Sequence, residues 1–213
     1  MKGLTDKAAI VTGGGSGIGR AIARRLAQEG MAVAILDMNR DNAEQVVGEI
    51  REAGGRGLAQ VCDITDNDQV TASVAAIEQA QGPTWALVNN AGWDSPMPFL
   101  KTEPAFWRKI IDLNYLGPLQ VTHAVASGMA ERASGRIIFI ASDAGRVGST
   151  GEVVYSGCKG GTIAFSKALA RELARKNVLL NCICPGPTNT PIMDSFAGAG
   201  EQGEKLRAAR VRA

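Results

Sequence analysis

The sequence predicts an α/β fold, a doubly wound parallel sheet, in a single domain that spans residues 1–213. Apolar runs of strand length alternate with segments of helical periodicity, as is typical of parallel strands joined by crossover helices. Neither a low-complexity linker nor an internal repeat divides the chain. Its 213 residues, 45% hydrophobic and 21% charged, suffice for one substantial core.

Six apolar runs have the length of strands. Their nearly continuous apolar character suits strands that are buried on both faces of a sheet. The expected strands are Ala8–Thr12, Ala32–Asp37, Leu58–Cys62, Ala86–Asn89, Arg136–Ala141 and Val178–Cys184.

Apolar residues at helical spacing predict five helical segments, which cover residues 18–26, 46–50, 70–77, 102–133 and 154–173. Gly30, Gly54 and Gly82 follow the first three segments, as expected where helices end. In the fourth segment, Gly117 and Pro118 predict an interruption.

The charge pattern argues against a polyanionic partner. The 23 Lys and Arg residues against 21 Asp and Glu give a net charge of +2, and the basic residues are spread along the chain. We therefore expect no nucleic-acid partner. The amino-terminal residues have neither the pattern of a signal peptide nor that of a membrane span, so we expect no membrane association and a cytoplasmic location.

The four cysteines and the single histidine form no metal-binding pattern, because no two cysteines have CxxC spacing. We therefore expect no metal site. These residues lie in apolar stretches, and we interpret them as core residues. They are Cys62, Cys158, Cys182, Cys184 and His123.

A glycine-rich turn, TGGGSGIG at residues 12–19, joins the first predicted strand to the first helix. Its glycines fit GxxxGxG at Gly13, Gly17 and Gly19 rather than GxGxxG. Glycine permits a tight turn, and a helix amino terminus attracts phosphate. The loop, which includes Ser16 and Ile18, is therefore a candidate site for a dinucleotide pyrophosphate. A merely flexible turn is the alternative.

Asp37 ends the second predicted strand, 18 residues after the last glycine of that loop. A carboxylate there can accept hydrogen bonds from the adenosine ribose hydroxyls and would repel a 2′-phosphate, which favours NAD over NADP. Arg40 can pair with such a phosphate, but Ser16 and Met38 add no charge. Alternatively, Asp37 simply begins a turn before Asn39.

Tyr155 and Lys159 are spaced i and i+4 on the last predicted helix, so both side chains project from one face. Free tyrosine, with a pKa of about 10, is a poor proton donor or base at neutral pH. A neighbouring ammonium group stabilises the phenolate and lowers that pKa. A YxxxK pattern alone is weak, because such pairs arise by chance on many helices.

Together with further motifs, these features resemble the short-chain dehydrogenase/reductase family over essentially the whole chain. The resemblance includes the order and spacing of the motifs, with Ser142 thirteen residues before Tyr155. It rests on TGGGSGIG, Asp37, Asp63, Asn89 to Gly92, Asn114, Ser142, Tyr155 with Lys159, and Pro185-Gly186 followed by Thr190. A Rossmann fold follows from it.

The resemblance implies a role for each motif. Tyr155 is the acid/base, Ser142 hydrogen-bonds the substrate oxygen, and Lys159 holds the nicotinamide ribose and lowers the pKa of the tyrosine. Asn114 holds a water in the proton relay. The other implied cofactor contacts are Asp63 and Ile64 at the adenine, Asn90, Ala91 and Gly92 beside the cofactor, Thr188 and Thr190 on the carboxamide side, and Pro185 and Gly186, which also bind the cofactor.

The sequence also departs from the family pattern. Phe139 and Ala141 stand where the family often has Asn and Ser. Family members usually continue through a further helix and a last strand, whereas residues 201–213 are charged and alanine-rich and contain no strand-like run. We therefore expect a sheet without that strand. The family implies a homo-oligomer, a dimer or a homotetramer, and the missing strand would weaken its assembly and leave the substrate pocket less closed.

The strings NNAGWD, IASDAGRVGSTGE and CKGG are most similar, within the family, to 2-hydroxycyclohexanecarboxyl-CoA dehydrogenases and, more loosely, to 3-oxoacyl carrier-protein reductases. They favour a small-molecule alcohol or ketone substrate, a hydroxyacyl thioester such as a CoA thioester. Alternatives are a reductase of 3-oxoacyl carrier proteins and a truncated, catalytically impaired dinucleotide-binding protein. The expected specificity residues are Trp93, Asp94, Asp143, Arg146, Val147, Ser149, Met193 and Phe196.

Overall fold

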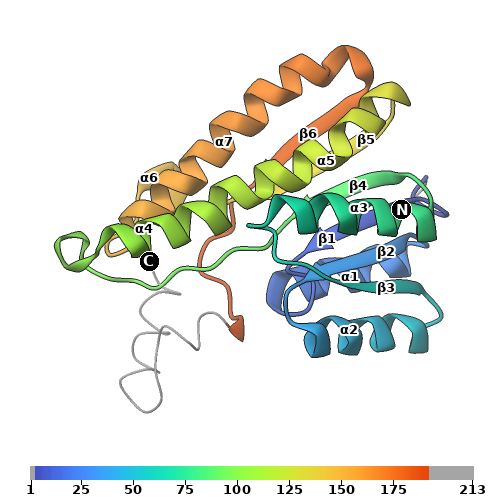
Figure 1. Ribbon diagram of the computed structural model, residues 1–213, viewed down its shortest axis with the longest axis horizontal. Helices are drawn as coiled ribbons and strands as arrows, with labels where there is room; N and C mark the ends of the chain where they lie inside the picture. Colours follow the sequence, from blue (N-terminus) through green and yellow to red (C-terminus); the bar gives the residue numbers. More distant parts are fainter. Residues whose placement is uncertain (1–2, 192–213) are drawn as a thin grey trace.

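A computed structural model describes residues 3–191 of the chain. Its strands are β1 (Ala8–Thr12), β2 (Ala32–Asp37), β3 (Arg56–Val61), β4 (Thr84–Asn89), β5 (Gly135–Ile140) and β6 (Val178–Ile183). They form one sheet in the order β3-β2-β1-β4-β5-β6, and every neighbouring pair is parallel (Figure 1). The predicted doubly wound Rossmann fold is confirmed.

The strand bounds agree with the sequence-based prediction to within two residues. β3 begins at Arg56 rather than Leu58, and β4 begins at Thr84 rather than Ala86. Arg56 pairs with Ala32, and Thr84 pairs with Ala8. Backbone pairing therefore extends each strand beyond its apolar run, because the hydrogen bonds of the ladder do not depend on the polarity of the side chains.

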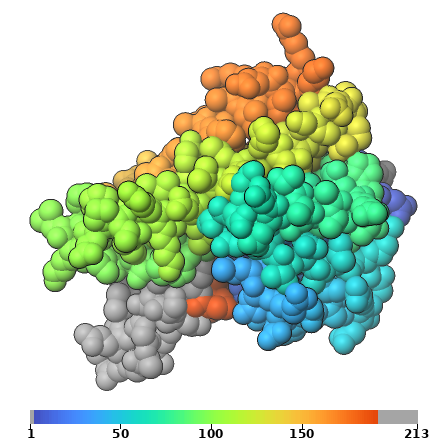
Figure 2. All heavy atoms as spheres, viewed as in Figure 1, coloured from blue at the N-terminus to red at the C-terminus, as the bar shows by residue number. Residues whose placement is uncertain are grey.

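Two layers of helices cover the two faces of the sheet. The longer helices are α1 (Gly17–Gln28), α2 (Arg40–Glu52), α3 (Asn67–Gln81), α4 (Pro104–Ile111), α5 (Gly117–Glu131) and α7 (Val153–Leu173). Side chains from α1 and α2 form one core cluster with the sheet, and side chains from α3 and α5 form the other. Figure 2 shows α3 and α5 packed against each other on the face of the sheet that they cover. Strand β1 is consequently buried along its whole length.

The helical region predicted at residues 102–133 is interrupted, but earlier than expected. A π-helical segment, Asp112–Leu116, connects α4 to α5, and the N–H of Gly117 donates to the carbonyl of Asp112, five residues before it. Pro118 lies within the first turn of α5, where a residue without an N–H does not break the hydrogen bonding of the helix. The predicted break at Gly117 and Pro118 is therefore a π segment that ends just before them.

Short elements complete the described chain. They are α6 (Ala144–Val147) and two 3-10 turns, Phe99–Lys101 and Ala174–Lys176. The sequence analysis did not predict α6. None of the helices in residues 3–191 is long and apolar enough to cross a membrane.

The interpretation of the cysteines and the histidine as core residues is partly wrong. Cys62 and Cys158 are buried, but Cys182 and Cys184 are only half-buried, and all four are free thiols. His123 is exposed on α5, because it lies between Val121 and Val125 on the helix face that points away from the sheet. Within residues 3–191, no three His, Cys, Asp or Glu side chains gather as a metal site would require.

β6 is an edge strand of the described part of the sheet. On one of its faces Leu179 and Ile183 are 45% and 52% exposed. The predictions that concern the last strand, residues 201–213, Met193 and Phe196 lie outside the described residues. The single domain extending to Ala213 stays a prediction.

Candidate active site

The sequence-predicted site residues gather at the carboxyl edge of the sheet. The glycine loop follows β1, Asn90 to Gly92 follow β4, Ser142 follows β5, and α7 carries Tyr155 and Lys159. The strand order changes direction between β1 and β4, which is the point where ligands bind in open parallel sheets.

The glycine loop is folded too tightly for side chains. A Cβ atom on Gly19 would lie 2.2 Å from the carbonyl oxygen of Gly13, and one on Gly13, whose φ is +60°, would lie 2.9 Å from the Cα of Ala91. Ser16 precedes α1 without capping it through its side chain. The first N–H groups of α1 can therefore serve a phosphate, so the loop fits a pyrophosphate group.

Thr12 clamps this loop to the segment after β4. Its hydroxyl oxygen, at the end of β1, accepts hydrogen bonds from the N–H groups of Asn90 and Ala91, both at 3.0 Å. The amide of Asn90 in turn donates to the carbonyls of Thr12 and Gly13 at 3.0 and 3.1 Å. The sequence analysis did not predict this hydrogen-bonding role of Thr12. A threonine at the end of a buried apolar strand could have indicated it.

Asp37 lies at the end of β2 and faces the glycine loop. One carboxylate oxygen accepts from the N–H of Gly15 and the other from the N–H of Asn39, both at 2.9 Å. The contact with Asn39 is the turn considered as an alternative. A carboxylate has about four acceptor positions, so Asp37 keeps capacity for ribose hydroxyls. Arg40, the competing phosphate ligand, is exposed and lies 3.5 Å from Glu44.

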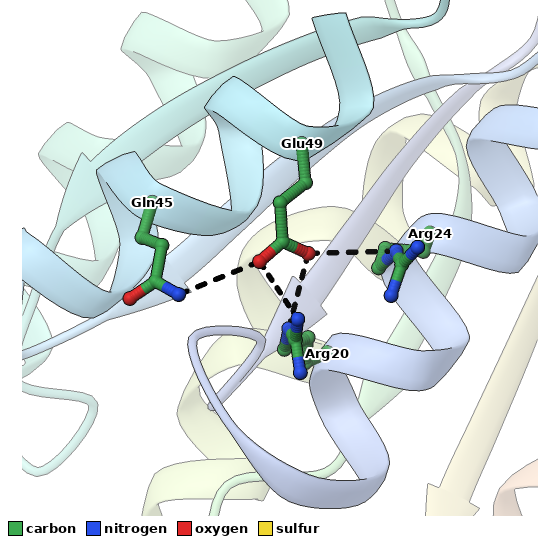
Figure 3. Close-up of polar contacts among 4 residues, drawn as sticks. All are labelled: Arg20, Arg24, Gln45 and Glu49. Carbon is green, nitrogen blue, oxygen red and sulfur yellow. Dashed lines mark hydrogen bonds and ion pairs between the residues drawn. The ribbon is translucent and has the colours of Figure 1, made fainter. Parts of the chain in front are cut away.

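An ion-pair network holds α1 against α2 beside this loop (Figure 3). Glu49 on α2 accepts hydrogen bonds from the Arg20 guanidinium at 2.7 and 3.1 Å, and Arg24 lies 3.5 Å from the same carboxylate. Gln45 contributes a longer contact of 3.5 Å. The hydrogen bonds from Arg20 lower the pKa of Glu49. The network therefore fixes the first turns of α1, which carry the candidate phosphate site.

The remaining cofactor candidates have varied surroundings. Thr190 lies against the loop, since a Cβ on Gly17 would be 3.4 Å from it. The carbonyl of Pro185 accepts a hydrogen bond from the N–H of Asp143 at 2.9 Å, which holds the segment after β6 near Ser142. Thr188 is exposed and donates to the carbonyl of Gly186.

Asp63 and Ile64 have mainly structural contacts in the chain itself. Asp63 accepts from the N–H and the hydroxyl of Thr65 at 2.9 and 2.8 Å. Ile64 is 4% exposed, and a Cβ on Gly117 would lie 2.7 Å from its side chain. Their placement beside an adenine stays a prediction.

Asn114, in the π segment, is completely buried. Its amide nitrogen donates to the carbonyls of Trp93 and Ile110 at 2.7 and 3.0 Å, and its oxygen accepts from the N–H of Trp93 at 3.2 Å. A Cβ on Gly92 would lie 2.7 Å from that oxygen. Asn114 therefore fixes the backbone after β4, and its role in holding a water stays a prediction.

Ser142, Tyr155 and Lys159 come together as the sequence predicts. The Ser142 side chain lies close enough to the Tyr155 hydroxyl to lower the pKa of the phenol. The Nζ atom of Lys159 lies 5.4 Å from the centre of the Tyr155 ring, and it donates to the carbonyl of Ile140 at 3.0 Å. Lys159 is only 4% exposed. One turn of α7 thus brings a phenol and a buried ammonium group to the end of β5.

Burial dominates the acid–base properties of this cluster. It raises the pKa of Tyr155 to about 12, against the lowering effect of the hydrogen bond with Ser142. Burial also lowers the pKa of Lys159 to about 8. Within the chain itself, desolvation of the phenolate outweighs the stabilising effect of Ser142 on the pKa of Tyr155, and the lowering of that pKa by Lys159 stays a prediction.

Comparison with known proteins agrees with this geometry. The family model described as short chain dehydrogenase matches residues 7–199. The chain belongs to the short-chain dehydrogenase/reductase family. It is therefore an oxidoreductase, and the resemblance found from the sequence motifs is confirmed.

Three relatives illustrate the range of this similarity. The (2S)-[(R)-hydroxy(phenyl)methyl]succinyl-CoA dehydrogenase subunit BbsD of Thauera aromatica is 36% identical over 200 residues, which cover 94% of this chain and 80% of BbsD. The crystal structure of an actinorhodin polyketide ketoreductase with NADPH has a TM-score of 0.89 and 36% identity, over 96% of this chain and 82% of that one. The structure of NAD+-bound xylitol dehydrogenase has a TM-score of 0.86 and 33% identity, over 96% and 76%.

Proposed function

We propose that this oxidoreductase transfers a hydride between a nicotinamide dinucleotide and a secondary alcohol or ketone, with Tyr155 as the acid/base. The observation that carries the proposal is the cluster at the end of β5, in which the half-buried Tyr155 interacts with the Ser142 side chain and has its ring centre 5.4 Å from the Nζ atom of the buried Lys159. The glycine loop and Asp37 fit the phosphates and the ribose of such a cofactor at the same edge of the sheet.

The side chains of the cluster divide the proton chemistry among them. When bound, the nicotinamide supplies or accepts the hydride. The Ser142 hydroxyl donates a hydrogen bond to the substrate oxygen, and Tyr155 donates its proton to that oxygen as a ketone becomes an alcohol. Because burial raises the pKa of Tyr155 to about 12, the phenol is protonated at neutral pH and ready to donate. The reverse reaction requires Tyr155 to lose that proton.

Replacement of the phenol hydroxyl tests this function. Tyr155→Phe keeps the ring in its packed position but removes the proton, so we expect turnover to fall by about 10²–10⁴-fold. NADH binding, measured by fluorescence titration, should stay near that of the parent, since the glycine loop is unchanged. Turnover close to normal in Tyr155→Phe would remove this residue from the mechanism.

NAD rather than NADP is the cofactor that Asp37 favours. Its carboxylate lies at the end of β2 with acceptor capacity for hydroxyls, and it would repel a 2′-phosphate. The related structures are divided, since the ketoreductase is described with NADPH and the xylitol dehydrogenase with NAD+.

Cofactor preference can be measured directly. We expect the parent to bind NADH more tightly than NADPH. Asp37→Ala should reduce the difference between the two affinities, because the repulsion of the 2′-phosphate is removed. Titration of both nucleotides against both proteins is the measurement. Tighter binding of NADPH by the parent would show that Asp37 has another role.

The substrate we propose is a hydroxyacyl or oxoacyl thioester, such as a cyclic hydroxyacyl-CoA. The motif NNAGWD and the similarity to BbsD, which is named a CoA-thioester dehydrogenase, support it. A 3-oxoacyl carrier-protein reductase is the alternative, and the similarity to a polyketide ketoreductase supports it. NADH oxidation with matched CoA and carrier-protein thioesters distinguishes them. A protein that binds NADH but reduces neither would be the catalytically impaired form.

Assembly and location complete the proposal. The family resemblance implies a homo-oligomer, a dimer or a tetramer, and light scattering of the full chain tests this. The cytoplasmic location expected from the sequence stays a prediction.

A further inference from the structure

A groove lies at the edge of the sheet, between α7 and β6. Its volume is about 760 Å³, and residues of α6, α7 and the β6 edge line it. The part of α7 that lines it runs from Gly160 to Arg171, which is about three helical turns, or about 16 Å. None of its lining residues belongs to the reaction cluster or to the cofactor candidates. The groove is therefore a separate feature that the proposed function leaves without a role.

The groove is positively charged. Its basic residues are Arg146 on α6 and Lys167 and Arg171 on α7, and no acidic residue lines it. Lys167 and Arg171 are exposed and one helical turn apart, and neither forms an ion pair within residues 3–191. Like charges at this spacing destabilise a helix. An anion bound in the groove would offset that repulsion.

One end of the groove lies next to the reaction cluster. Gly145 of α6 lines the groove, and its N–H donates to the carbonyl of Ser142 at 3.0 Å. A Cβ on Gly145 would lie 2.6 Å from the carbonyl carbon of Lys159, so α6 packs directly on α7 there. The four residues of α6 span only about 6 Å. A flexible chain that crosses α6 therefore joins the groove to the Ser142 hydroxyl.

Arg146 stands at this crossing. Its guanidinium lies 3.7 Å from the carboxylate of Asp143, and both side chains are largely exposed. A guanidinium has five N–H donors, so Arg146 keeps donors for an anion.

The rest of the groove is apolar or uncharged. Ile163, Ala170 and Leu180 line it, and Leu180 and Cys182 pack against the core. An inorganic anion alone would leave these side chains in water, whereas an apolar chain alone would leave the cations unpaired. The lining therefore suits a ligand that combines an arm with apolar groups and several negative charges.

We propose that this groove binds the coenzyme A part of a thioester substrate, with the phosphates at Lys167 and Arg171 and the pantetheine arm crossing α6 beside Arg146. Arginine and lysine side chains are the usual protein partners of phosphate groups. Coenzyme A carries a diphosphate and a 3′-phosphate, whereas the arm of a carrier protein carries a single phosphodiester and offers less charge to these cations. The inference rests on the proposed function and deepens it, because it selects between the two thioester classes.

The test compares two thioesters of the same acyl group. Acetoacetyl-CoA carries the phosphates and the N-acetylcysteamine thioester of acetoacetate lacks them, so the ratio of their kcat/KM values with NADH reports what the phosphates contribute. Lys167→Gln combined with Arg171→Gln should lower this ratio by about ten-fold or more, through a higher KM for acetoacetyl-CoA at nearly unchanged kcat. Arg175→Gln combined with Lys176→Gln removes the same two charges from exposed positions outside the groove, and it should leave the ratio unchanged.

The outcomes separate this inference from the proposed function. A ratio in the Lys167 and Arg171 double variant within about two-fold of the parent overturns the role of the groove, while hydride transfer stands. An equal loss with the acetoacetyl thioester of a carrier protein overturns the choice of coenzyme A.

If the parent reduces neither thioester, hydride transfer fails, and calorimetric titration with coenzyme A alone decides about the groove. Affinity that falls by about ten-fold or more in the double variant, and not in the Arg175 and Lys176 control, supports the site. No binding to the parent, or equal affinity in all three proteins, overturns it.

Discussion

Burial changes the pKa values of Tyr155 and Lys159 in opposite directions. The phenol becomes a weaker acid, with a pKa of about 12, and the ammonium becomes a stronger one, with a pKa of about 8. Each residue is therefore driven toward its neutral form, because a poorly hydrated site penalises any charge. The cluster gains its chemistry at a cost in stability, since the ammonium of Lys159 is charged at neutral pH.

The cost of burying Lys159 should depend on pH. Its pKa in the folded chain, about 8, is below the ordinary value of 10.5, so the unfolded chain holds more protons between these pH values. Stability must then rise with pH across that window, by up to about 3 kcal/mol for this one group. Urea unfolding of the parent and of Lys159→Met, at about pH 7 and about pH 10, isolates the contribution. A difference between the two proteins that does not change with pH would contradict the burial of a charged Lys159.

The elements of the site are joined by contacts between residues far apart in the sequence. Thr12 at the end of β1 is 1% exposed, and its hydroxyl serves two backbone N–H groups in the segment after β4. Asn114 holds the next part of that segment, since it accepts from the N–H of Trp93 and donates to the carbonyl of the same residue. The path of the chain from Asn90 to Trp93 is thus set by two side chains on different elements.

Loss of the Thr12 hydroxyl should separate β1 from this segment. Thr12→Val keeps the shape of the side chain but leaves two half-buried N–H groups without their acceptor, which we expect to cost about 1 to 3 kcal/mol of stability. Thr12→Ser keeps the acceptor and loses one methyl group, at a cost of about 1 kcal/mol. Denaturant unfolding compares the two. Equal stability of both variants would mean that water or another group replaces the hydroxyl.

Most of the fold could be predicted from the sequence, because strands buried on both faces leave unbroken apolar runs and α1, α2 and α3 leave helical repeats. The glycine loop and Tyr155 with Lys159 were predicted because their chemistry depends on short spacing. The contacts of Thr12 and of Asn114 span 78 and 21 residues, and no local pattern reveals them. Gly117 and Pro118 signalled a break in this helical region, but nothing in the sequence showed that it is a π segment, because side-chain polarity does not reveal which carbonyl a backbone N–H will bond.

For the molecule as a whole, we expect the candidate cofactor site and the core to unfold as one cooperative unit. The glycine loop is bonded to β2 through Asp37 and to the segment after β4 through Asn90. A ligand that binds only the folded chain stabilises all of it, by about 2.7 kcal/mol at a concentration of 100 times Kd.

This coupling predicts a shift of the whole unfolding transition. NADH should raise the melting temperature of the parent in a dose-dependent manner. Gly19→Ala should abolish the shift, because its Cβ would lie 2.2 Å from a backbone oxygen of the loop. Gly48→Ala, a helix position with open space around it, should retain it and is the matched control. The measurement is calorimetry with and without NADH, and an NADH shift that survives in Gly19→Ala would place the nucleotide elsewhere.

The extra residue in the π segment also determines which neighbouring helices α4 and α5 can contact. An inserted residue turns everything after it by about 100° relative to an unbroken helix. That offset lets α4 face α7 while α5, its continuation, faces α3. Asn114 lies in the π segment between the two helices, and its amide nitrogen donates a hydrogen bond to the carbonyl of Ile110. We therefore expect a chain one residue shorter at this point to keep one of these helix contacts but not both, which would make the local chain length as important to the site as the identity of Asn114.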